Sequence, residues 1–199
     1  MQQDQWDQRY AATELVWTAE PNRFVVEELA GETPGRALDL ATGEGRNAIW
    51  LAEQGWQVTA VDFSPVGLAK AAKLAAARGV SVNWENADLR QYHPAPGGYD
   101  LVLLAYLHLP PGEFGAVLTM AAAALAPGGT LLVVGHDVAN LSEGYGGPQD
   151  PQILHRADDI VAALPGLTIR RSGQARRLVR TADGDRAAID TVVRARRPA

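Results

Sequence analysis

Hydrophobic and polar positions follow two periods along this chain. Apolar runs typical of buried strands occupy residues 36–42, 56–62, 80–86, 99–106 and 130–137. Stretches with helical spacing lie before or between these runs, at 21–30, 47–54, 64–79 and 111–126. Because strands and helices alternate, the pattern predicts an α/β domain whose parallel sheet is covered by helices on both faces.

The last part of the chain departs from this alternation. After a short helix at 157–164, two strand-like runs at 167–180 and 186–197 flank TADGD, 181–185, whose Asp-Gly pair signals a tight turn. We therefore predict a Rossmann-like, doubly wound and mostly parallel seven-stranded sheet with a C-terminal antiparallel hairpin. Residues 1–199 are expected to form a single domain, with its core at 36–199.

Composition removes several classes of protein. The chain has no cysteine, which excludes disulfides, thiolate metal sites and cysteine nucleophiles. No uninterrupted apolar run reaches about 18 residues, so no transmembrane helix is expected. The N-terminus, MQQDQWDQRY, is polar and acidic, unlike a secretory signal, and we expect a cytoplasmic protein.

Charge is unevenly distributed. The net charge of −5 argues against a nucleic-acid partner, yet residues 170–199 hold nine arginines against three acids. Since most of these arginines alternate with apolar residues, we expect them on the solvent face of the last two strands. The expected partner is a small-molecule substrate, with no nucleic acid and no membrane, and the exposed strand edge allows a monomer or a homodimer.

Residues 39–48, DLATGEGRNA, indicate a chain that bends sharply around a nucleotide-like ligand. Gly43 to Ala48 fit the pattern G-x-G-x-x-A, and Asp62 follows 19 residues after Gly43, as in dinucleotide-binding folds. Taken alone, this loop is compatible with a nicotinamide-dependent oxidoreductase.

Acidic residues around the loop favour a cationic ligand instead. Asp39 lies inside the strand, where a carboxylate repels a pyrophosphate and attracts a sulfonium or an amino group. Asp88 follows the third strand at the same edge of the sheet, where a carboxylate can accept a hydrogen bond from an adenine amino group. Acids after three successive strands therefore point to a cationic adenosyl ligand.

This set of residues resembles class I S-adenosylmethionine-dependent methyltransferases. The resemblance rests on four segments, LDLATGEGRNAIWLAEQGWQVTAVDFSP, NADL, YDLVLLAYLHL and LAPGGTLLVV. It is closest to a small bacterial group similar to tellurite-resistance and thiopurine methyltransferases, and it runs from about Trp6 to the last strand. It implies S-adenosyl-L-methionine as the cofactor and S-adenosyl-L-homocysteine as the product. Thr42 and Arg46 differ from the broader family pattern, although Arg46-Asn47 is frequent in the bacterial group.

The resemblance also implies which residues contact the cofactor. The glycine loop and Asp39 would contact its methionine part, Asp62 its ribose hydroxyls, and the residues after the second and third strands its adenine ring. The implied cofactor-binding residues in the core are Asp39, Ala41, Gly43, Gly45, Asn47, Asp62, Phe63, Ala87, Asp88 and Leu104.

The N-terminal residues 1–30 are implied to form a helical lid segment over the cofactor. Within WDQRYAATELVW, 6–17, Arg9 would meet the cofactor carboxylate and Trp17 would line the substrate pocket. The alternative is that the aromatic residues of this segment only anchor a terminal helix to the core.

Histidines are the candidates for a group that faces the methyl acceptor. His108 follows the fourth strand and is the candidate catalytic residue. His136 and Asp137 end the fifth strand, and His155-Arg156 follow the glycine-rich loop 143–148; a structural role is the alternative for each. The histidines lack ligand spacing, so no metal site is expected.

We therefore expect a methyltransferase that acts on a small molecule, with a thiol or a chalcogen oxyanion as a candidate acceptor. Such an enzyme chiefly aligns donor and acceptor, and it needs a base only when the acceptor arrives protonated. Two alternatives stay open. An NAD(P)-dependent oxidoreductase calls for a second substrate domain that is not evident, and a non-catalytic methyltransferase-like binding protein is disfavoured by the intact loop.

Overall fold

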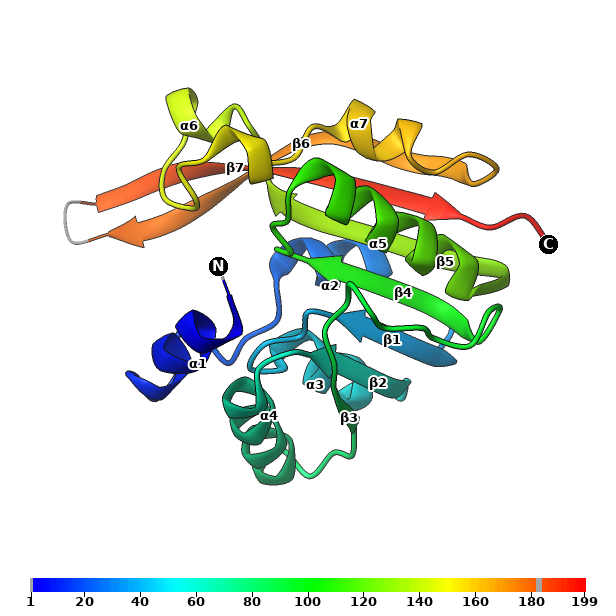
Figure 1. Cartoon of the computed structure of the whole chain (residues 1–199), viewed down its shortest axis with the longest axis horizontal. Helices are drawn as coiled ribbons and strands as arrows, with labels where there is room; N and C mark the ends of the chain where they lie inside the picture. The colour runs from blue at the N-terminus through cyan, green and yellow to red at the C-terminus, as the bar shows by residue number, and fades with distance from the viewer. Residues whose placement is uncertain (1, 182–183) are drawn as a thin grey trace.

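A seven-stranded sheet forms the centre of the molecule in the computed structural model, which describes residues 2–181 and 184–199 (Figure 1). The strand order is β3-β2-β1-β4-β5-β7-β6. The first five strands are parallel, and β7 runs antiparallel between β5 and β6. The strands are β1 Arg36–Leu40, β2 Gln57–Asp62, β3 Asn83–Asn86, β4 Tyr99–Ala105, β5 Leu125–His136, β6 Thr168–Thr181 and β7 Gly184–Arg196.

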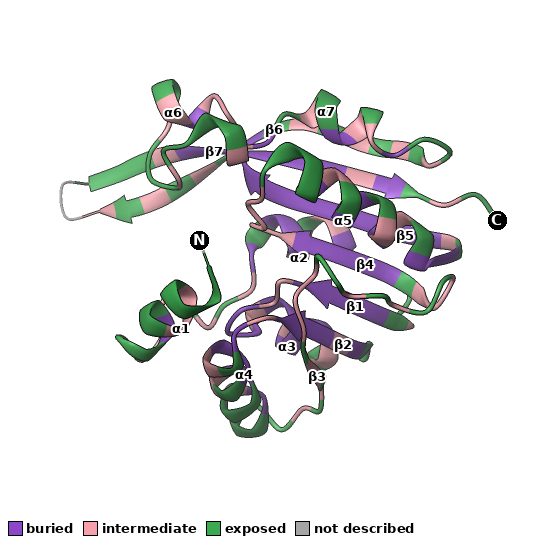
Figure 2. Ribbon diagram, viewed as in Figure 1, coloured by how far each residue is buried: buried purple, intermediate pink, exposed green. Residues whose placement is uncertain are grey.

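Helices cover both faces of the sheet, so the predicted doubly wound α/β fold is confirmed. Side chains of α2 and α3 pack with one set of buried strand residues, and those of α5 and α7 with the other set. Figure 2 shows buried residues along the central strands β1, β2, β4 and β5. Successive residues of a strand point to opposite faces, as Leu103 and Leu104 do. The helices are α1 Gln3–Ala11, α2 Arg23–Leu29, α3 Arg46–Glu53, α4 Pro65–Ala77, α5 Pro111–Ala124, α6 Asn140–Glu143 and α7 Ala157–Ala162, with a 3₁₀ turn at Pro151–Ile153.

Local sequence explains where α4 begins and why β3 begins later than predicted. The Ser64 hydroxyl accepts the Gly67 N–H at 3.0 Å, and Pro65 occupies the first turn, so this helix start is as predicted. At the other end, the Val80 N–H donates to the Ala75 carbonyl at 3.1 Å. The backbone after α4 therefore completes the helix terminus, and residues 80–82 are not part of the strand predicted for 80–86.

The start of β5 also differs from the prediction. Residues 127–129 were expected to separate a helix from a strand that begins at 130, but the strand already begins at Leu125. Its early part pairs with the end of the chain, because the Gly128 N–H donates to the Arg197 carbonyl and the Arg197 N–H donates to the Gly129 carbonyl. Long-range pairing with the C-terminal residues therefore extends this strand.

The strands β1 and β4 end slightly earlier than their apolar runs predicted, whereas β2 and β3 end where predicted. Ala41 and Tyr106 follow β1 and β4 with left-handed φ angles of 61° and 60°, which end the extended conformation. The C-terminal hairpin is confirmed, since β6 and β7 pair from Thr168 with Arg196 to Thr181 with Gly184. The tip of the predicted turn, residues 182–183, lies outside the described residues.

Candidate functional site

The loop after β1 is folded around the carboxylate of Asp62. Ala41, Gly43 and Gly45 have left-handed φ angles of 61°, 58° and 78°, which turn the chain from β1 into α3. Asp62 ends β2 and accepts the Gly43 N–H at 2.8 Å and the Ser64 N–H at 2.9 Å, through different oxygens. Because a carboxylate oxygen can accept more than one hydrogen bond, Asp62 retains capacity for ligand hydroxyls.

Asp39 lies below this loop with 1% of its surface exposed. The Thr42 hydroxyl donates to the Asp39 carboxylate at 2.7 Å. Burial raises the pKa of Asp39 to about 7, and the hydrogen bond from Thr42 offsets only part of that rise. No ion pair involves Asp39 in the described part of the chain, so a cationic ligand group beside it would favour its ionised form.

The N-terminal segment packs against the glycine loop and is hydrogen-bonded to it. Tyr10 of α1 is buried, and a Cβ on Gly43 would lie 2.7 Å from its hydroxyl. The Glu44 carboxylate accepts the backbone N–H groups of residues 16–17 at 3.0 and 3.1 Å and pairs with Lys70 at 3.1 Å. The segment therefore lies over the loop in the place where the resemblance implies a lid.

Arg9 and Trp17, the two residues of this segment predicted to contact ligands, contact each other. The Arg9 guanidinium carbon lies 5.0 Å from the Trp17 ring centroid and 5.1 Å from that of Trp6. Arg9 is exposed and Trp17 is 43% exposed. The cation–π contacts anchor the segment, and the ligand contacts of Arg9 and Trp17 stay predictions.

The remaining predicted cofactor residues line the same edge of the sheet. Asp88 has a partner that the sequence did not indicate, because Arg90 Nε donates to both of its carboxylate oxygens at 2.9 and 3.0 Å. This hydrogen bonding lowers the pKa of Asp88. Asn47 lies in the first turn of α3, Phe63 follows β2, Ala87 follows β3, and Leu104 lies near the end of β4. Their roles stay predictions.

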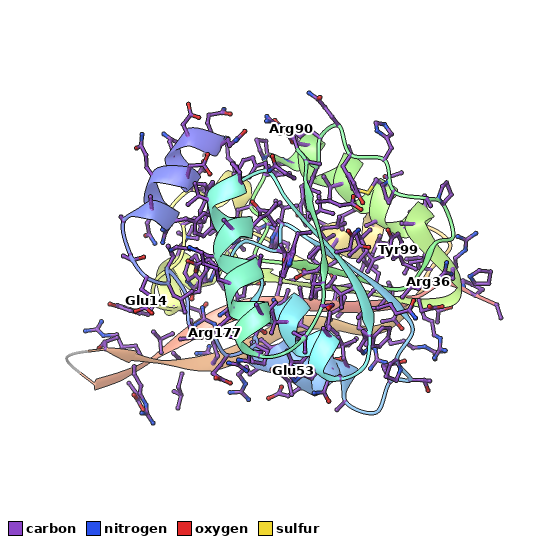
Figure 3. All side chains as sticks on the ribbon, turned by 90° about the horizontal axis from the view of Figure 1, so that it is seen from below. Glu14, Arg36, Glu53, Arg90, Tyr99 and Arg177 are labelled. Carbon is purple, nitrogen blue, oxygen red and sulfur yellow. The ribbon has the colours of Figure 1, made fainter. Side chains whose placement is uncertain are left out.

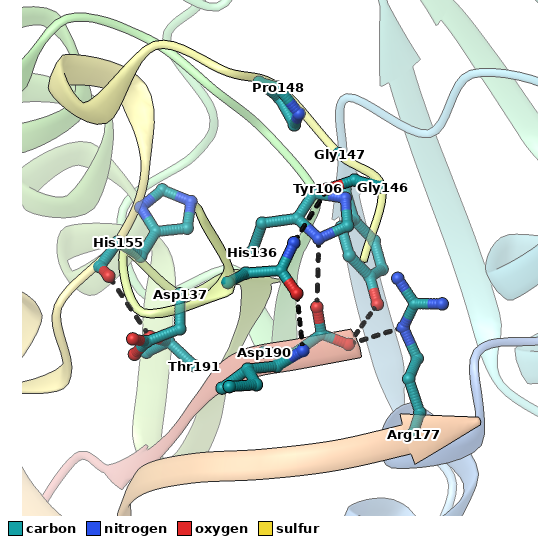
Figure 4. Close-up of polar contacts among 12 residues, drawn as sticks. Tyr106, His136, Asp137, Gly146, Gly147, Pro148, His155, Arg177, Asp190 and Thr191 are labelled. Carbon is teal, nitrogen blue, oxygen red and sulfur yellow. Dashed lines mark hydrogen bonds and ion pairs between the residues drawn. The ribbon is translucent and has the colours of Figure 1, made fainter. Parts of the chain in front are cut away.

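A second polar group lies where the ends of β4 and β5 meet the middle of β7 (Figure 4). We call Asp190 and its neighbours Tyr106, His136 and Arg177 the Asp190 cluster. Asp190 is 0% exposed; it accepts the Tyr106 hydroxyl at 2.8 Å and Arg177 Nε at 2.7 Å, and its Oδ1 lies 3.2 Å from His136 Nδ1. Burial raises the pKa of Asp190, but His136 and Arg177 together hold it below its ordinary value. The carboxylate is therefore ionised and compensated inside the protein.

Asn22 connects the Asp190 cluster to the glycine loop. Its side-chain amide donates to the Tyr106 hydroxyl at 3.1 Å, and its backbone N–H donates to Asn47 Oδ1 at 2.9 Å. Asn22 also caps α2 by accepting the Phe24 N–H at 2.9 Å. A chain of hydrogen bonds thus runs from the first turn of α3 to Asp190.

The predicted histidines are brought together beside this cluster. The His108 ring centroid lies 5.4 Å from that of His136 and 5.1 Å from that of His155. His108 Nδ1 lies 2.9 Å from the Ile153 carbonyl, while its buried Nε2 has no hydrogen-bond partner among the residues that the structure describes. Burial is the main reason that the pKa falls to about 3 for His108 and about 4 for His155, so both rings are neutral.

Two other candidates are placed differently. Asp137 is engaged within the protein, where it accepts the Thr191 hydroxyl at 2.6 Å and the Gln174 amide at 2.9 Å. Arg156 is exposed where α7 begins. Asp137 therefore holds β7 and β6 to the end of β5.

The glycine-rich loop 143–148 lies over His136. A Cβ on Gly147 would lie 3.0 Å from His136 Nε2 and 2.9 Å from two ring carbons, so a side chain there would collide with the ring. Asn140 fixes the loop, because its amide donates to the Gly146 carbonyl at 2.7 Å and accepts a backbone N–H of β7 at 2.7 Å.

Sequence reasoning missed several residues of this region. Arg177 was expected on the solvent face of the hairpin with the other arginines, but its side chain is only 23% exposed and binds Asp190. Asp190 had a sequence signal, since it is a lone acid within AAIDTVV, 187–193. Tyr106 and Asn22 had no recognisable signal in the sequence, because their roles depend on contacts between distant segments.

Other features of the structure lie away from this edge. One cleft is lined by residues at the amino ends of the strands, including Arg36 and Tyr99, which lie together in Figure 3, away from Arg177. Within residues 2–181 and 184–199 no cluster of three His, Asp or Glu side chains has the arrangement of a metal site. None of the described helices has the length and apolar character needed to span a membrane.

Comparisons with known proteins agree with this geometry. Residues 37–129 match the family model described as a methyltransferase domain. The chain is 36% identical over 114 residues to the demethylmenaquinone methyltransferase of Thermus thermophilus. That match covers 56% of this chain and 52% of the relative, so this chain spans about half the length of that protein.

Solved structures match a larger share of the chain. NodS of Bradyrhizobium japonicum, an N-methyltransferase in complex with S-adenosyl-L-homocysteine, has a TM-score of 0.71 at 20% identity, with 98% of each chain covered. A structure determined for the conversion of a disulfide bond into a thioacetal group during echinomycin biosynthesis has a TM-score of 0.77 at 23% identity, covering 98% of this chain and 92% of the other. These similarities establish the fold.

Proposed function

We propose that this chain, whose residues 37–129 match a methyltransferase domain, is an S-adenosylmethionine-dependent methyltransferase that acts on a small molecule. The observation that carries the proposal is Asp39, a buried carboxylate without an ion-pair partner among the described residues, beside a loop of left-handed glycines. The loop suits a ligand that approaches the backbone closely, and the carboxylate suits a ligand with a positive charge.

The described residues fit this cofactor at three points. Asp39 is placed for the ammonium or sulfonium part, and Asp62 for the ribose hydroxyls. A side chain at Gly43 would meet Tyr10, so the loop and the N-terminal segment form a close-fitting wall. When bound, S-adenosylmethionine supplies a methyl group on a positively charged sulfur; the protein's task is to orient an acceptor toward that group and to keep water away.

The chemical class of the methyl acceptor is inferred from the similar proteins and from the resemblance. The similarity to a demethylmenaquinone methyltransferase supports a small-molecule acceptor, and the resemblance to tellurite-resistance and thiopurine methyltransferases makes thiols and chalcogen oxyanions further candidates. The predicted catalytic His108 belongs to the same proposal, since its Nε2 is buried without a partner in the described part of the chain.

Titration calorimetry tests the proposal with S-adenosylmethionine, S-adenosylhomocysteine and NADH as ligands. We expect micromolar binding of the two adenosyl ligands and no heat with NADH. Asp62→Ala should abolish binding, because the Gly43 and Ser64 N–H groups lose their acceptor. The exposed Asp159→Ala is the matched control and should bind as wild type. Binding of NADH alone would show that the protein is an oxidoreductase instead.

A further inference from the structure

We propose that His136, held by Asp190, takes the proton from an acidic hydroxyl of the methyl acceptor, which makes a phenol or an enol the substrate class. This inference rests on the proposed function. It assigns proton transfer to a residue other than His108 and gives a role to the Asp190 cluster.

The orientation of His136 supports the assignment. Its Nδ1 lies 3.2 Å from Asp190 Oδ1, within ion-pair distance although the two atoms are not aligned as a hydrogen bond. A carboxylate beside Nδ1 favours the tautomer with hydrogen on Nδ1, so Nε2 carries the free lone pair. Gly147 lies against the face of this ring, where a Cβ would be 3.0 Å from Nε2 and 2.9 Å from Cγ and Cδ2, so only a residue without a side chain leaves space beside the buried ring.

The position of the Asp190 cluster suits a group that reacts with the cofactor. Both it and the glycine loop lie at the carboxyl edge of the sheet, where open α/β sheets bind ligands. The hydrogen bonds from Asn47 through Asn22 and Tyr106 to Asp190 join the two regions directly. Tyr106 therefore links the Asp190 cluster, through Asn22, to the first turn of α3.

The charges of the region favour an acceptor that becomes negative. The guanidinium carbons of Arg46 and Arg177 lie 6.0 and 5.8 Å from the Tyr106 ring centroid. Arg177 is paired with Asp190. Asp39 and Glu44 attract Arg46, but no carboxylate lies at ion-pair distance from it in the described part of the chain. An oxygen that loses its proton therefore gains stabilisation from Arg46, whereas an amine acceptor would become more positive and would be repelled.

His108 has a different role in this arrangement. Its Nδ1–H donates to the Ile153 carbonyl, which leaves an unshared lone pair on the buried Nε2. Because its Nε2 is buried and burial lowers the pKa of the ring to about 3, His108 is a poor proton acceptor but can accept a hydrogen bond from a second polar group of the substrate. We assign His108 to positioning.

The chemical step conserves atoms and charge. The acceptor O–H bond breaks, and its proton goes to His136 Nε2. The oxygen forms a bond to the methyl carbon, while the bond between that carbon and the sulfonium sulfur breaks and its electron pair passes to sulfur. The products are a methyl ether, S-adenosylhomocysteine and protonated His136, which Asp190 stabilises until the proton leaves to solvent.

The test uses 4-nitrophenol as a probe, because its ionised form absorbs separately from its neutral form. The full chain is saturated with S-adenosylhomocysteine, whose binding is measured first by calorimetry, and is then titrated with the probe at pH 6. We expect bound probe to be ionised, with its apparent pKa lowered by about one unit, a tenfold change in the ionised ratio. His136→Gln should remove that shift, and His93→Gln, an exposed histidine away from the cluster, should keep it.

The outcomes separate this inference from the proposed function. If S-adenosylhomocysteine binds but the probe stays neutral, or ionises equally in His136→Gln, the inference is overturned and the proposed function stands. If S-adenosylhomocysteine does not bind, the proposed function fails and this inference fails with it.

A second measurement requires no variant. Nitrogen NMR of the wild-type protein with labelled, assigned histidines should show hydrogen on His136 Nδ1, and the probe should shift the His136 signals more than those of His93. Unchanged His136 signals would contradict the proposal. Turnover adds a further check: phenols should release S-adenosylhomocysteine in wild type, with kcat reduced about 100-fold in His136→Gln, whereas an equal rate in the variant would overturn it.

Discussion

Asp39 and Asp190 are both buried at the same edge of the sheet, yet they ionise in opposite ways. Asp39 is 1% exposed, has no ion-pair partner among the described residues, and its pKa is raised by burial to about 7. Asp190 is 0% exposed and is also opposed by burial, but His136 and Arg177 lower its pKa. Burial alone therefore does not decide the charge of a carboxylate; the partners that the fold provides decide it.

The difference indicates two kinds of site. Asp190 already has its counter-charge, so it stabilises the protein and orients His136. Asp39 has no ion-pair partner in the described part of the chain; Arg46 attracts it, but its pKa stays raised, so the protein carries a cost there that a cationic ligand can remove. Substitutions at the two positions should have opposite effects on stability.

The largest effect is expected for Asp190→Asn. The substitution leaves the half-buried Arg177 without its negative partner, which should lower the free energy of unfolding by about 3 kcal/mol and Tm by roughly 6–12 °C. Thermal and denaturant unfolding measure both quantities. The exposed Asp159→Asn should change the free energy by less than about 0.5 kcal/mol. Equal stability of the two variants would show that Asp190 is not ionised in the folded protein.

Asp39→Asn should increase stability, the opposite of Asp190→Asn, and it should weaken ligand binding. At pH 8 the wild-type carboxylate is buried and charged, so the neutral amide should raise the free energy of unfolding by about 1–2 kcal/mol. Affinity for S-adenosylhomocysteine should fall about 10- to 100-fold, because a charge-assisted hydrogen bond is lost. Calorimetry and denaturant unfolding at pH 8 measure the two changes. Destabilisation together with unchanged affinity would exclude a ligand role for Asp39.

The pH dependence of stability and of ligand affinity gives a second test of the difference between Asp39 and Asp190. The folded pKa of Asp39, about 7, lies above its model value of 3.8, so its contribution to stability is complete below about pH 4 and is lost as pH rises through 7. The stability advantage of Asp39→Asn should therefore disappear by about pH 4. A cationic ligand binds the ionised form, so wild-type affinity should fall about tenfold from pH 8 to pH 6. Calorimetry across this range should give a flat profile for Asp39→Asn.

The last prediction concerns Asn22, which joins the two regions. Asn22→Ala removes the cap of α2 and the donor to Tyr106, and should cost about 1 kcal/mol for the cap plus about 1 kcal/mol for the hydrogen bond. Asn22→Ser keeps a capping oxygen and loses only the donor to Tyr106. Denaturant unfolding should place the serine variant between wild type and the alanine variant. A serine variant as stable as wild type would mean that the contact with Tyr106 contributes nothing, whereas equal values for the two variants would mean that the cap contributes nothing.

The same comparison shows how far the sequence predicts this molecule. The glycine loop was recognised because its residues are neighbours in the chain and because left-handed turns favour glycine. The Asp190 cluster was largely missed because it joins residues 84 apart, Tyr106 and Asp190, through a side-chain hydrogen bond. The histidines were found as strand-end residues, but their mutual stacking required the fold.

Element boundaries show the same division. The hairpin and the sheet class followed from apolar periodicity and turn residues. The start of β3 and the start of β5 did not, because the first depends on the end of α4 and the second on pairing with the C-terminal residues. Local pattern predicts the elements, and contacts between segments set their ends.

The Glu44 contacts that hold residues 16–17 and Lys70 also bear on the turnover rate expected of the proposed methyltransferase. In the proposed methyltransferase, spent cofactor must leave after each cycle, and the segment over the loop must open before it can. Turnover is then limited by how often a few hydrogen bonds and one ion pair break, and the chemical step can be faster than the cycle. In the proposed methyltransferase, these Glu44 contacts would therefore set the rate at which the product leaves.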